Sequence, residues 1–184
     1  MRPAVFLDRD GTVNVDTGYV GRARDVILIP GAAKAIARLN AAGIPVVIVT
    51  NQSGIGRGLL KPDDYALVRD RVAELVREQS GARVDATYEC PHDPRVGECA
   101  CRKPGTALFV RAALDLDLAL DRSWYVGDRW RDVAPAVDLG GFGVLVPSAG
   151  TPDDDVRRAR DQARVADTLN EAVDAVLASL APVR

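Results

Sequence analysis

Short apolar runs alternate with helix-like segments along this chain, and this alternation restricts the folds that it can adopt. Five runs are rich in β-branched and aromatic residues and are bounded by Gly, Pro, Asp or Asn, as buried strands are: AVFLD (4–8), IPVVIVT (44–50), VDATYE (84–89), SWYVGD (123–128) and GFGVLVP (141–147). The apolar spacing between them predicts helices at 31–42 and at about 62–79, 105–114 and 132–139. Strands that alternate with helices pair in parallel through right-handed crossovers. We therefore predict an α/β fold, with a Rossmann-like open parallel sheet and helices on both faces.

The C-terminal part of the chain predicts one more helix, over 168–180, because apolar residues recur there at helical spacing. The stretch TPDDDVRRARDQAR (151–164) before it is highly charged, and we expect it to be a solvated surface segment. At 184 residues, 47% of them hydrophobic, the chain is long enough for one sizeable core and short for two. We therefore expect residues 1–184 to form a single domain.

The charge pattern gives no reason to expect a nucleic acid or a membrane as partner. The net charge is −2 and the charges are interspersed, whereas binding to polyanions needs clustered Lys and Arg. The longest apolar stretches are far below the roughly 20 residues that span a bilayer. An acidic DRD begins at Asp8, too early for the apolar part of a secretory signal, and the three cysteines are an odd number. We expect a cytoplasmic monomer.

The segment CPHDPRVGECACRKP (90–104) contains every cysteine of the chain and its single histidine. A C-x-H-x6-C-x-C array provides a complete tetrahedral ligand set for Zn²⁺ and leaves no position for a reacting water. A structural zinc site is therefore predicted, with the ligands Cys90, His92, Cys99 and Cys101. The alternative is a set of buried cysteines beside an unrelated histidine.

Polar residues follow several predicted strands, at the ends where ligands bind in open α/β sheets. They are two acids two positions apart, a hydroxyl, a cation and a further acid: Asp8, Asp10, Thr50, Lys103 and Asp128. Each alone has an ordinary explanation as a turn residue, a helix cap or a solvated lysine. Chance does not readily supply all five in this order, so we expect a catalytic site at this edge.

The glycine-rich SGIGRG (53–58) follows a strand and precedes a helix, as a nucleotide-binding loop does. Its glycines are spaced G-x-G-x-G, whereas the dinucleotide fingerprint is G-x-G-x-x-G, and no Walker lysine follows. We expect a flexible loop whose amides help to hold a phosphate group.

Four segments around the acids resemble the motifs of the haloacid dehalogenase superfamily of phosphotransferases: FLDRDGTVN (6–14), VVIVTNQSG (46–54), RKP (102–104) and VGDRWRD (126–132). The resemblance runs from about residue 4 to 146 and implies the fold of that superfamily. Many members insert a cap domain between the motifs. Here the spacings leave no room for one, so we expect a capless domain with a zinc-binding loop.

The resemblance implies a phosphatase with four catalytic residues. Asp8 is the implied nucleophile, which forms an aspartyl phosphate. Asp10 is the implied general acid, which protonates the leaving alkoxide and then takes a proton from the attacking water. Thr50 and Lys103 are expected to compensate the charge on the phosphoryl oxygens.

The same resemblance implies a catalytic Mg²⁺ ion held by the carboxylates of Asp8 and Asp128 and by the backbone carbonyl of Asp10. Asp132 lies one helical turn after Asp128 and is expected to orient Lys103 or a water on the ion. An acid favoured at a helix N-terminus is an equally good explanation of Asp132.

The cysteine loop, together with DRDGTVNVDTGYV (8–20) and TNQSGIGRG (50–58), is similar to the D,D-heptose 1,7-bisphosphate phosphatase branch of the superfamily. This implies hydrolysis of the 7-phosphate of D-glycero-D-manno-heptose 1,7-bisphosphate, a small phosphorylated sugar, in the biosynthesis of nucleotide-activated heptose. The implied substrate-binding residues are Asp16, Thr17, Gly18, Tyr19, Thr50, Asn51, Gln52, Ser53, Arg102, Lys103 and Arg129.

Within this set, Arg102 is expected to bind the second phosphate group. Arg129 stands where family members have lysine, so a planar fork replaces a point charge. Two alternative functions stay open at this point. One is hydrolysis of histidinol phosphate in histidine biosynthesis, and the other is a noncatalytic, zinc-stabilised binding module.

Overall fold

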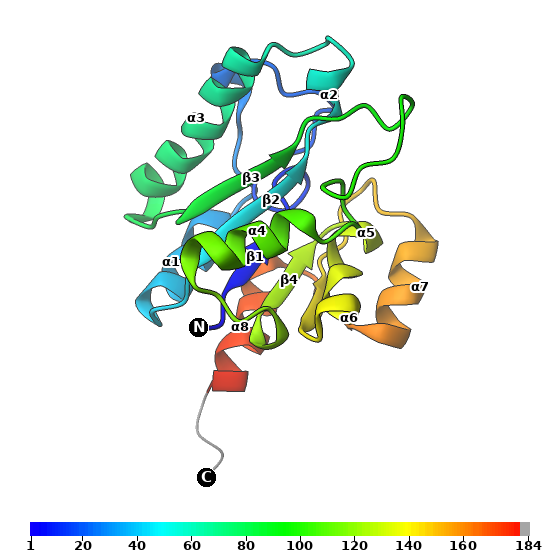
Figure 1. Cartoon of the computed structure of the whole chain (residues 1–184). Helices are drawn as coiled ribbons and strands as arrows, with labels where there is room; N and C mark the ends of the chain where they lie inside the picture. The colour runs from blue at the N-terminus through cyan, green and yellow to red at the C-terminus, as the bar shows by residue number, and fades with distance from the viewer. Residues whose placement is uncertain (181–184) are drawn as a thin grey trace.

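A six-stranded parallel sheet lies at the centre of the computed structural model, which describes residues 1–180 (Figure 1). The strand order is β3-β2-β1-β4-β5-β6. The strands are β1 (Val5–Leu7), β2 (Val46–Asn51), β3 (Ala86–Cys90), β4 (Trp124–Gly127), β5 (Phe142–Leu145) and β6 (Arg164–Val165). All five predicted strands are present, and the two-residue β6 is an addition at one edge. The predicted open parallel α/β sheet is confirmed.

Helices cover both faces of this sheet. Val5 and Leu7 of β1 face the larger core, whereas Phe6 between them faces the smaller one, because successive strand residues point to opposite sides. The helices of the larger core are α1 (Ala32–Ala41), α3 (Pro62–Ser80) and α8 (Leu169–Leu180). Those of the smaller core are α4 (Ala107–Leu116), in front of the sheet in Figure 1, and α6 (Pro135–Leu139).

Helix α3 shows how local sequence sets the bounds of a helix. Pro62 occupies its first position, where a missing N–H costs no hydrogen bond, and Asp63 and Asp64 lie in the first turn beside the positive end of the helix dipole. Gly81 ends the helix with φ 69°, a left-handed conformation that favours glycine. The start matches the sequence-based prediction.

Three segments differ from the predictions. The helix expected at 132–139 is divided into α5 (Trp130–Val133) and α6, because Pro135 cannot donate a backbone hydrogen bond. The charged surface segment forms the helix α7 (Asp153–Gln162), in which only Ala159 is buried. The glycine-rich loop contains the short helix α2 (Ser53–Gly56). Two single 3-10 turns, η1 (Ala23–Asp25) and η2 (Leu120–Arg122), complete the described structure.

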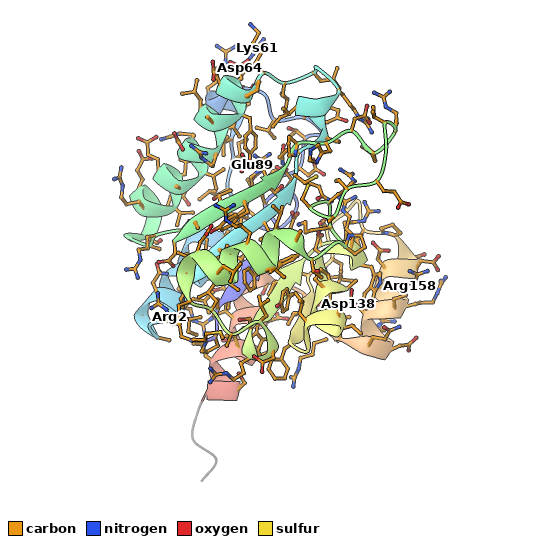
Figure 2. The ribbon with its side chains drawn as sticks, viewed as in Figure 1. Arg2, Lys61, Asp64, Glu89, Asp138 and Arg158 are labelled. Atoms are coloured by element: carbon orange, nitrogen blue, oxygen red, sulfur yellow. The ribbon has the colours of Figure 1, made fainter. Side chains whose placement is uncertain are left out.

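Charged side chains are exposed on several elements of the molecule. Lys61 at the start of α3 and Arg158 on α7 project away from the ribbon (Figure 2). Among the helices of residues 1–180, none combines the length and the apolar character that crossing a membrane requires.

Candidate active site and metal centre

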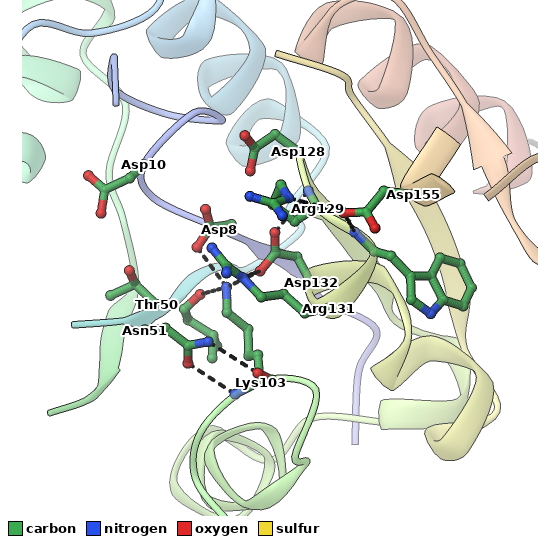
Figure 3. Close-up of polar contacts among 12 residues, drawn as sticks. Asp8, Asp10, Thr50, Asn51, Lys103, Asp128, Arg129, Arg131, Asp132 and Asp155 are labelled. Carbon is green, nitrogen blue, oxygen red and sulfur yellow. Dashed lines mark hydrogen bonds and ion pairs between the residues drawn. The ribbon is translucent and has the colours of Figure 1, made fainter. Parts of the chain in front are cut away.

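The polar residues predicted at the strand ends converge at the carboxyl edge of the sheet. Asp8 follows β1, Thr50 belongs to β2, Lys103 lies in the loop between β3 and α4, and Asp128 follows β4. The exposed fraction of each of these residues is 7% or less. Figure 3 shows Asp8 and Lys103 beside Asp132, which belongs to α5. Parallel pairing of β1 with β2 and β4 explains this convergence of distant residues.

Lys103 is the buried cation at the centre of the site. Its Nζ lies 2.6 Å from Asp8 Oδ1 and 2.8 Å from Asp132 Oδ1, and it donates a hydrogen bond to the carbonyl oxygen of Val49 at 2.5 Å. Burial alone would lower the pKa of Lys103, but the carboxylates of Asp132 and Asp8 outweigh it and raise the pKa above the ordinary value. Lys103 is therefore positively charged in this arrangement.

The side chain of Asn51 holds the backbone that carries Lys103. Asn51 Nδ2 donates to the carbonyl oxygen of Lys103 at 3.1 Å, and the amide of Lys103 donates to Asn51 Oδ1 at 3.0 Å (Figure 3). Asn51 also lines the adjacent cavity, where the sequence predicts that it binds substrate. The clamp on Lys103 was not predicted, because it joins residues 52 positions apart in sequence.

The carboxylates of Asp8, Asp128 and Asp132 form a compact acidic cluster. One oxygen from each lies within 4.8 Å of the others. Burial raises the pKa of Asp8 to about 7, against the opposing effect of Lys103, and burial also raises the pKa of Asp128. Lys103 is the one buried cation that contacts any of these three carboxylates among the described residues, so the cluster holds more negative charge than Lys103 compensates. The donor set therefore fits a hard divalent cation such as Mg²⁺, which binds carboxylate oxygens.

Two glycines allow the backbone to pass close to these acids. A Cβ atom on Gly11 would lie 2.4 Å from Asp128 Oδ2, and Gly11 has φ +87°. A Cβ atom on Gly127 would lie 2.3 Å from Asp132 Cβ. A larger residue at either position would displace the acid itself.

The carboxylate of Asp10 lies apart from the acidic cluster, as Figure 3 shows. Its Oδ1 accepts hydrogen bonds from Arg9 Nε at 3.0 Å and Asn14 Nδ2 at 2.9 Å. Its Oδ2 accepts from Arg9 Nη2 and from Gln52 Nε2, both at 2.8 Å. Gln52 also donates to Thr50 Oγ1 at 2.9 Å, so it connects Asp10 to the centre of the site. Neither Arg9 nor Asn14 was among the predicted site residues.

A cavity of about 350 Å³ opens beside these residues. Its lining residues are Asp8, Asp10, Gly11, Val15, Asp16, Gly18, Ile29, Thr50, Asn51, Asp128, Arg129, Arg131, Ser148, Ala149 and Gly150. Five residues of the predicted substrate-binding set are thus at the cavity: Asp16, Gly18, Thr50, Asn51 and Arg129. Six lie outside its lining: Thr17, Tyr19, Gln52, Ser53, Arg102 and Lys103. A larger hollow beside α3 contains no residue of the acidic cluster.

The two arginines that line the cavity differ in whether an acid binds their guanidinium groups. Arg129 Nε donates to Asp155 Oδ2 of α7 at 3.0 Å (Figure 3). Arg131 has Asp132 as its nearest acid among the described residues, at 3.9 Å, and its side chain is 44% exposed. Arg131 is therefore free to bind an anion that enters the cavity. Arg131 was not among the predicted site residues, although its place three residues after Asp128 in VGDRWRD was a usable signal.

The four predicted zinc ligands lie together after β3. The Sγ atoms of the three cysteines are 3.1–3.6 Å apart, and His92 Nδ1 lies 3.6 Å from Cys90 Sγ and 3.1 Å from Cys101 Sγ. Ligands at about 2.3 Å from a tetrahedral zinc ion are about 3.8 Å from one another. Two thiol–thiol distances, 3.5 and 3.6 Å, and the 3.6 Å from His92 Nδ1 to Cys90 Sγ are close to this spacing. The two pairs at 3.1 Å both involve Cys101, which would need to move outward slightly to hold a Zn²⁺ ion.

A buried acid connects the cysteine loop to the loop that carries Tyr19. Asp93 accepts hydrogen bonds from Arg95 Nη2 at 2.6 Å and Nε at 2.9 Å, and these bonds lower the pKa of Asp93 to about 2. Arg57 Nε lies 3.4 Å from Asp93 Oδ1, and Arg57 Nη1 donates to the hydroxyl of Tyr19 at 2.9 Å. The cysteine loop is therefore connected to Tyr19 through Asp93 and Arg57.

Two sequence families match the chain. Residues 5–60 match the family described as haloacid dehalogenase-like hydrolase, and residues 100–172 match the family described as HAD-hydrolase-like. These ranges contain the strands and loops that carry Asp8, Thr50, Lys103 and Asp128.

Individual relatives match over nearly the whole chain. A D-glycero-D-manno-heptose-1,7-bisphosphate 7-phosphatase of Thermosynechococcus vestitus is 38% identical, with 98% of each chain covered. A D-glycero-beta-D-manno-heptose-1,7-bisphosphate 7-phosphatase of Mesorhizobium japonicum is 43% identical, with 91% of this chain and 81% of the relative covered. The crystal structure of a D,D-heptose 1,7-bisphosphate phosphatase of B. bronchiseptica, complexed with magnesium and phosphate, matches with a TM-score of 0.85. It is 34% identical, and the match covers 97% of this chain and 99% of that one.

Proposed function

We propose a reaction for this chain from the premise that it belongs to the heptose 1,7-bisphosphate 7-phosphatase family of haloacid dehalogenase-like hydrolases. The chain is a phosphoric monoester hydrolase that removes the 7-phosphate of D-glycero-D-manno-heptose 1,7-bisphosphate and leaves heptose 1-phosphate. One observation carries the proposal: buried Lys103 lies between Asp8 and Asp132, beside a cavity that Asp8, Asp10 and Asp128 line. The relatives favour this substrate over histidinol phosphate, and a catalytic set of this kind argues against a binding module.

Asp8 acts as the nucleophile in this proposal. Its carboxylate oxygen attacks the phosphorus of the 7-phosphate, and the bond from phosphorus to the sugar oxygen breaks. Asp8 must be ionised for this step, and Lys103 at 2.6 Å favours the ionised form. Thr50 and Lys103 provide a hydroxyl and an ammonium group for the phosphoryl oxygens, whose charge grows in the transition state.

Asp10 acts as the general acid and then as the general base in this proposal. It donates a proton to the departing sugar oxygen, and it then accepts a proton from the water that hydrolyses the aspartyl phosphate. The hydrogen bonds of Gln52 to both Asp10 and Thr50 support this role, because they connect the carboxylate of Asp10 to the centre of the site.

Mg²⁺ is the proposed catalytic cation, with Asp8, Asp128 and the backbone carbonyl of Asp10 as ligands. When bound, it neutralises charge so that an anionic nucleophile can approach an anionic substrate. Asp132 contacts Lys103 in the structure, which supports the orienting role that the sequence predicts. Zn²⁺ is the proposed structural ion of the cysteine loop.

Phosphate release from purified protein tests the proposed reaction. We expect turnover of heptose 1,7-bisphosphate, with much slower turnover of histidinol phosphate, and a reversible loss of activity when a mild chelator removes Mg²⁺. Both C1 anomers should be measured, since no residue described above distinguishes them. Preferred turnover of histidinol phosphate would overturn the assignment.

Recognition of the 1-phosphate is a second prediction, and it concerns Arg131 and Arg102. Arg131 lines the cavity, and its guanidinium is no closer than 3.9 Å to an acid of the described residues. We therefore propose that it binds the phosphate that is not cleaved. A charge-assisted contact contributes roughly 1.5–3 kcal/mol, so Arg131→Ala should reduce the preference for the bisphosphate over heptose 7-phosphate by about 10- to 150-fold. Steady-state kinetics with both substrates measures this preference.

Arg102→Ala is compared with Arg131→Ala on the same two substrates. If Arg102 binds the 1-phosphate, as the sequence predicts, its removal should also affect the bisphosphate more than the monophosphate. An equal loss on both substrates would mean that Arg102 has another role. The same result for Arg131→Ala would remove Arg131 from phosphate recognition.

The single-domain organisation of residues 1–184 and the monomeric, cytoplasmic state also stay proposals. Size-exclusion chromatography with light scattering tests the monomer, and limited proteolysis tests the single domain.

A further inference from the structure

Arg9 is buried although it lies between two acids of the site. Its exposed fraction is 1%, and it is among the largest fully buried side chains of the described residues. A buried guanidinium is unfavourable unless other groups compensate its charge and its hydrogen-bond donors. The partners of Arg9 therefore indicate why a cation occupies this position.

The main partner is the carboxylate of Asp10. Arg9 Nε and Nη2 each donate to a different oxygen of that carboxylate, at 3.0 and 2.8 Å. A two-bond contact of this kind fixes the plane of the carboxylate as well as its distance. The backbone also folds back here, because the carbonyl oxygen of Arg9 accepts from the amides of Val13 and Asn14 at 2.9 and 3.0 Å. This turn places Asn14 against Asp10.

Tyr65 of α3 supports Arg9 from the other side. The Arg9 Cζ atom lies 5.3 Å from the centre of the Tyr65 ring, within the range of a cation–π contact. Tyr65 is 2% exposed, and its hydroxyl has no hydrogen-bond partner among the described residues. The ring, rather than the hydroxyl, is therefore the part of Tyr65 that contacts the guanidinium.

The other two partners of Asp10 are of a different kind. Asn14 and Gln52 are amides, and an amide that turns over presents an oxygen in place of its N–H groups. The guanidinium of arginine has only N–H donors, so it cannot present an acceptor to Asp10. The four donors occupy the four acceptor positions of the carboxylate, and the two from Arg9 belong to one rigid fork, so Arg9 sets the orientation of the carboxylate.

We propose that Arg9 is a positioning residue that fixes the orientation of Asp10 through both proton transfers, with Tyr65 holding Arg9 in place. The inference rests on the proposed phosphatase function. In the first transfer the proton of Asp10 goes to the sugar oxygen as its bond to phosphorus breaks. In the second, water bonds to phosphorus, its proton goes to Asp10, and the Asp8 carboxylate leaves.

The test compares leaving groups that differ in their need for a proton. A sugar alkoxide needs protonation, whereas p-nitrophenolate leaves without it. Because kcat/KM reports the steps up to the first phosphoryl transfer, Arg9→Met should lower kcat/KM for heptose 1,7-bisphosphate by about 100-fold. It should change kcat/KM for p-nitrophenyl phosphate by less than about threefold.

Two further variants separate positioning from a general structural effect. Arg9→Lys keeps the positive charge but loses the planar guanidinium, so it should lower kcat/KM for the sugar substrate by less than Arg9→Met does. Circular dichroism shows whether each variant is folded. If Arg9→Met does not fold, Arg9→Lys takes its place in the comparison of the two substrates. In an Asp10→Asn background, Arg9→Met should have no additional effect on the sugar substrate, because the two residues act as a unit.

Equal losses on both substrates, or an undiminished effect of Arg9→Met in the Asp10→Asn background, would overturn the proposal. The wild-type protein separates this outcome from a failure of the proposed function. If it does not hydrolyse heptose bisphosphate, the function is wrong. The leaving-group comparison is then made with whichever primary alkyl phosphate the wild-type protein does hydrolyse.

Discussion

Asp8→Asn should reduce hydrolysis of the bisphosphate to near background while the protein stays folded. The amide has nearly the size of the carboxylate, but it is a poor nucleophile and a weak ligand for Mg²⁺. Removal of the nucleophile in other hydrolases suggests a loss of at least about 10⁴-fold. Lys103 keeps its ion pair with Asp132 at 2.8 Å, so the buried cation is still compensated and we expect little loss of stability.

Phosphate release and thermal unfolding, measured on the same preparation, check this prediction. Asp138→Asn is a matched control, because Asp138 is an exposed acid on α6 outside the cavity (Figure 2). The control should retain the activity of the wild type. Substantial turnover by a folded Asp8→Asn protein would exclude the aspartyl-phosphate mechanism.

Cys101→Ser should release zinc and destabilise the protein severely. A structural zinc site can supply on the order of 10 kcal/mol of folding free energy, which is comparable to the whole stability of a domain. Activity should fall as well, because Cys101 precedes Lys103 by two residues and the loop also supports Tyr19 through Asp93 and Arg57. Metal analysis should find about one zinc per wild-type chain and less in the variant.

Ala100→Ser is the control for this loop. It places the same hydroxyl group between two ligands but removes neither, and Ala100 is exposed, so zinc content and melting temperature should not change. Two results on the wild type would contradict the zinc site. One is protein purified without chelators that contains no zinc, and the other is three thiols that titrate freely in the native state.

The strands and the convergence of the acids were predictable because they depend on local sequence and on one general property of parallel sheets. The apolar runs that end in Asp8, Thr50 and Asp128 have the composition of buried strands, and parallel pairing then brings their ends to one edge. The clustering of Cys90, His92, Cys99 and Cys101 was also predictable, since these four residues lie within twelve consecutive positions.

What sequence analysis missed depends on contacts between distant segments. The clamp of Asn51 on Lys103 and the pairing of Arg129 with Asp155 join residues 52 and 26 positions apart, and no local pattern marks either. Helix α7 was not predicted, because its many charged residues leave little apolar periodicity. The three acids in its first turn, starting at Asp153, were nevertheless a signal for a helix start. No role was predicted for Arg9, because only the folded structure shows it buried against Tyr65.

The close approach of Gly11 and Gly127 to the acidic cluster limits how this enzyme can evolve. At both positions the atoms that a new side chain would strike belong to Asp128 or Asp132, so no neighbouring loop can absorb the change. Gly97 is the opposite case, because a Cβ atom there would meet nothing within 4 Å. Among random variants that keep activity, we therefore expect no substitution at Gly11 or Gly127 and frequent substitution at Gly97.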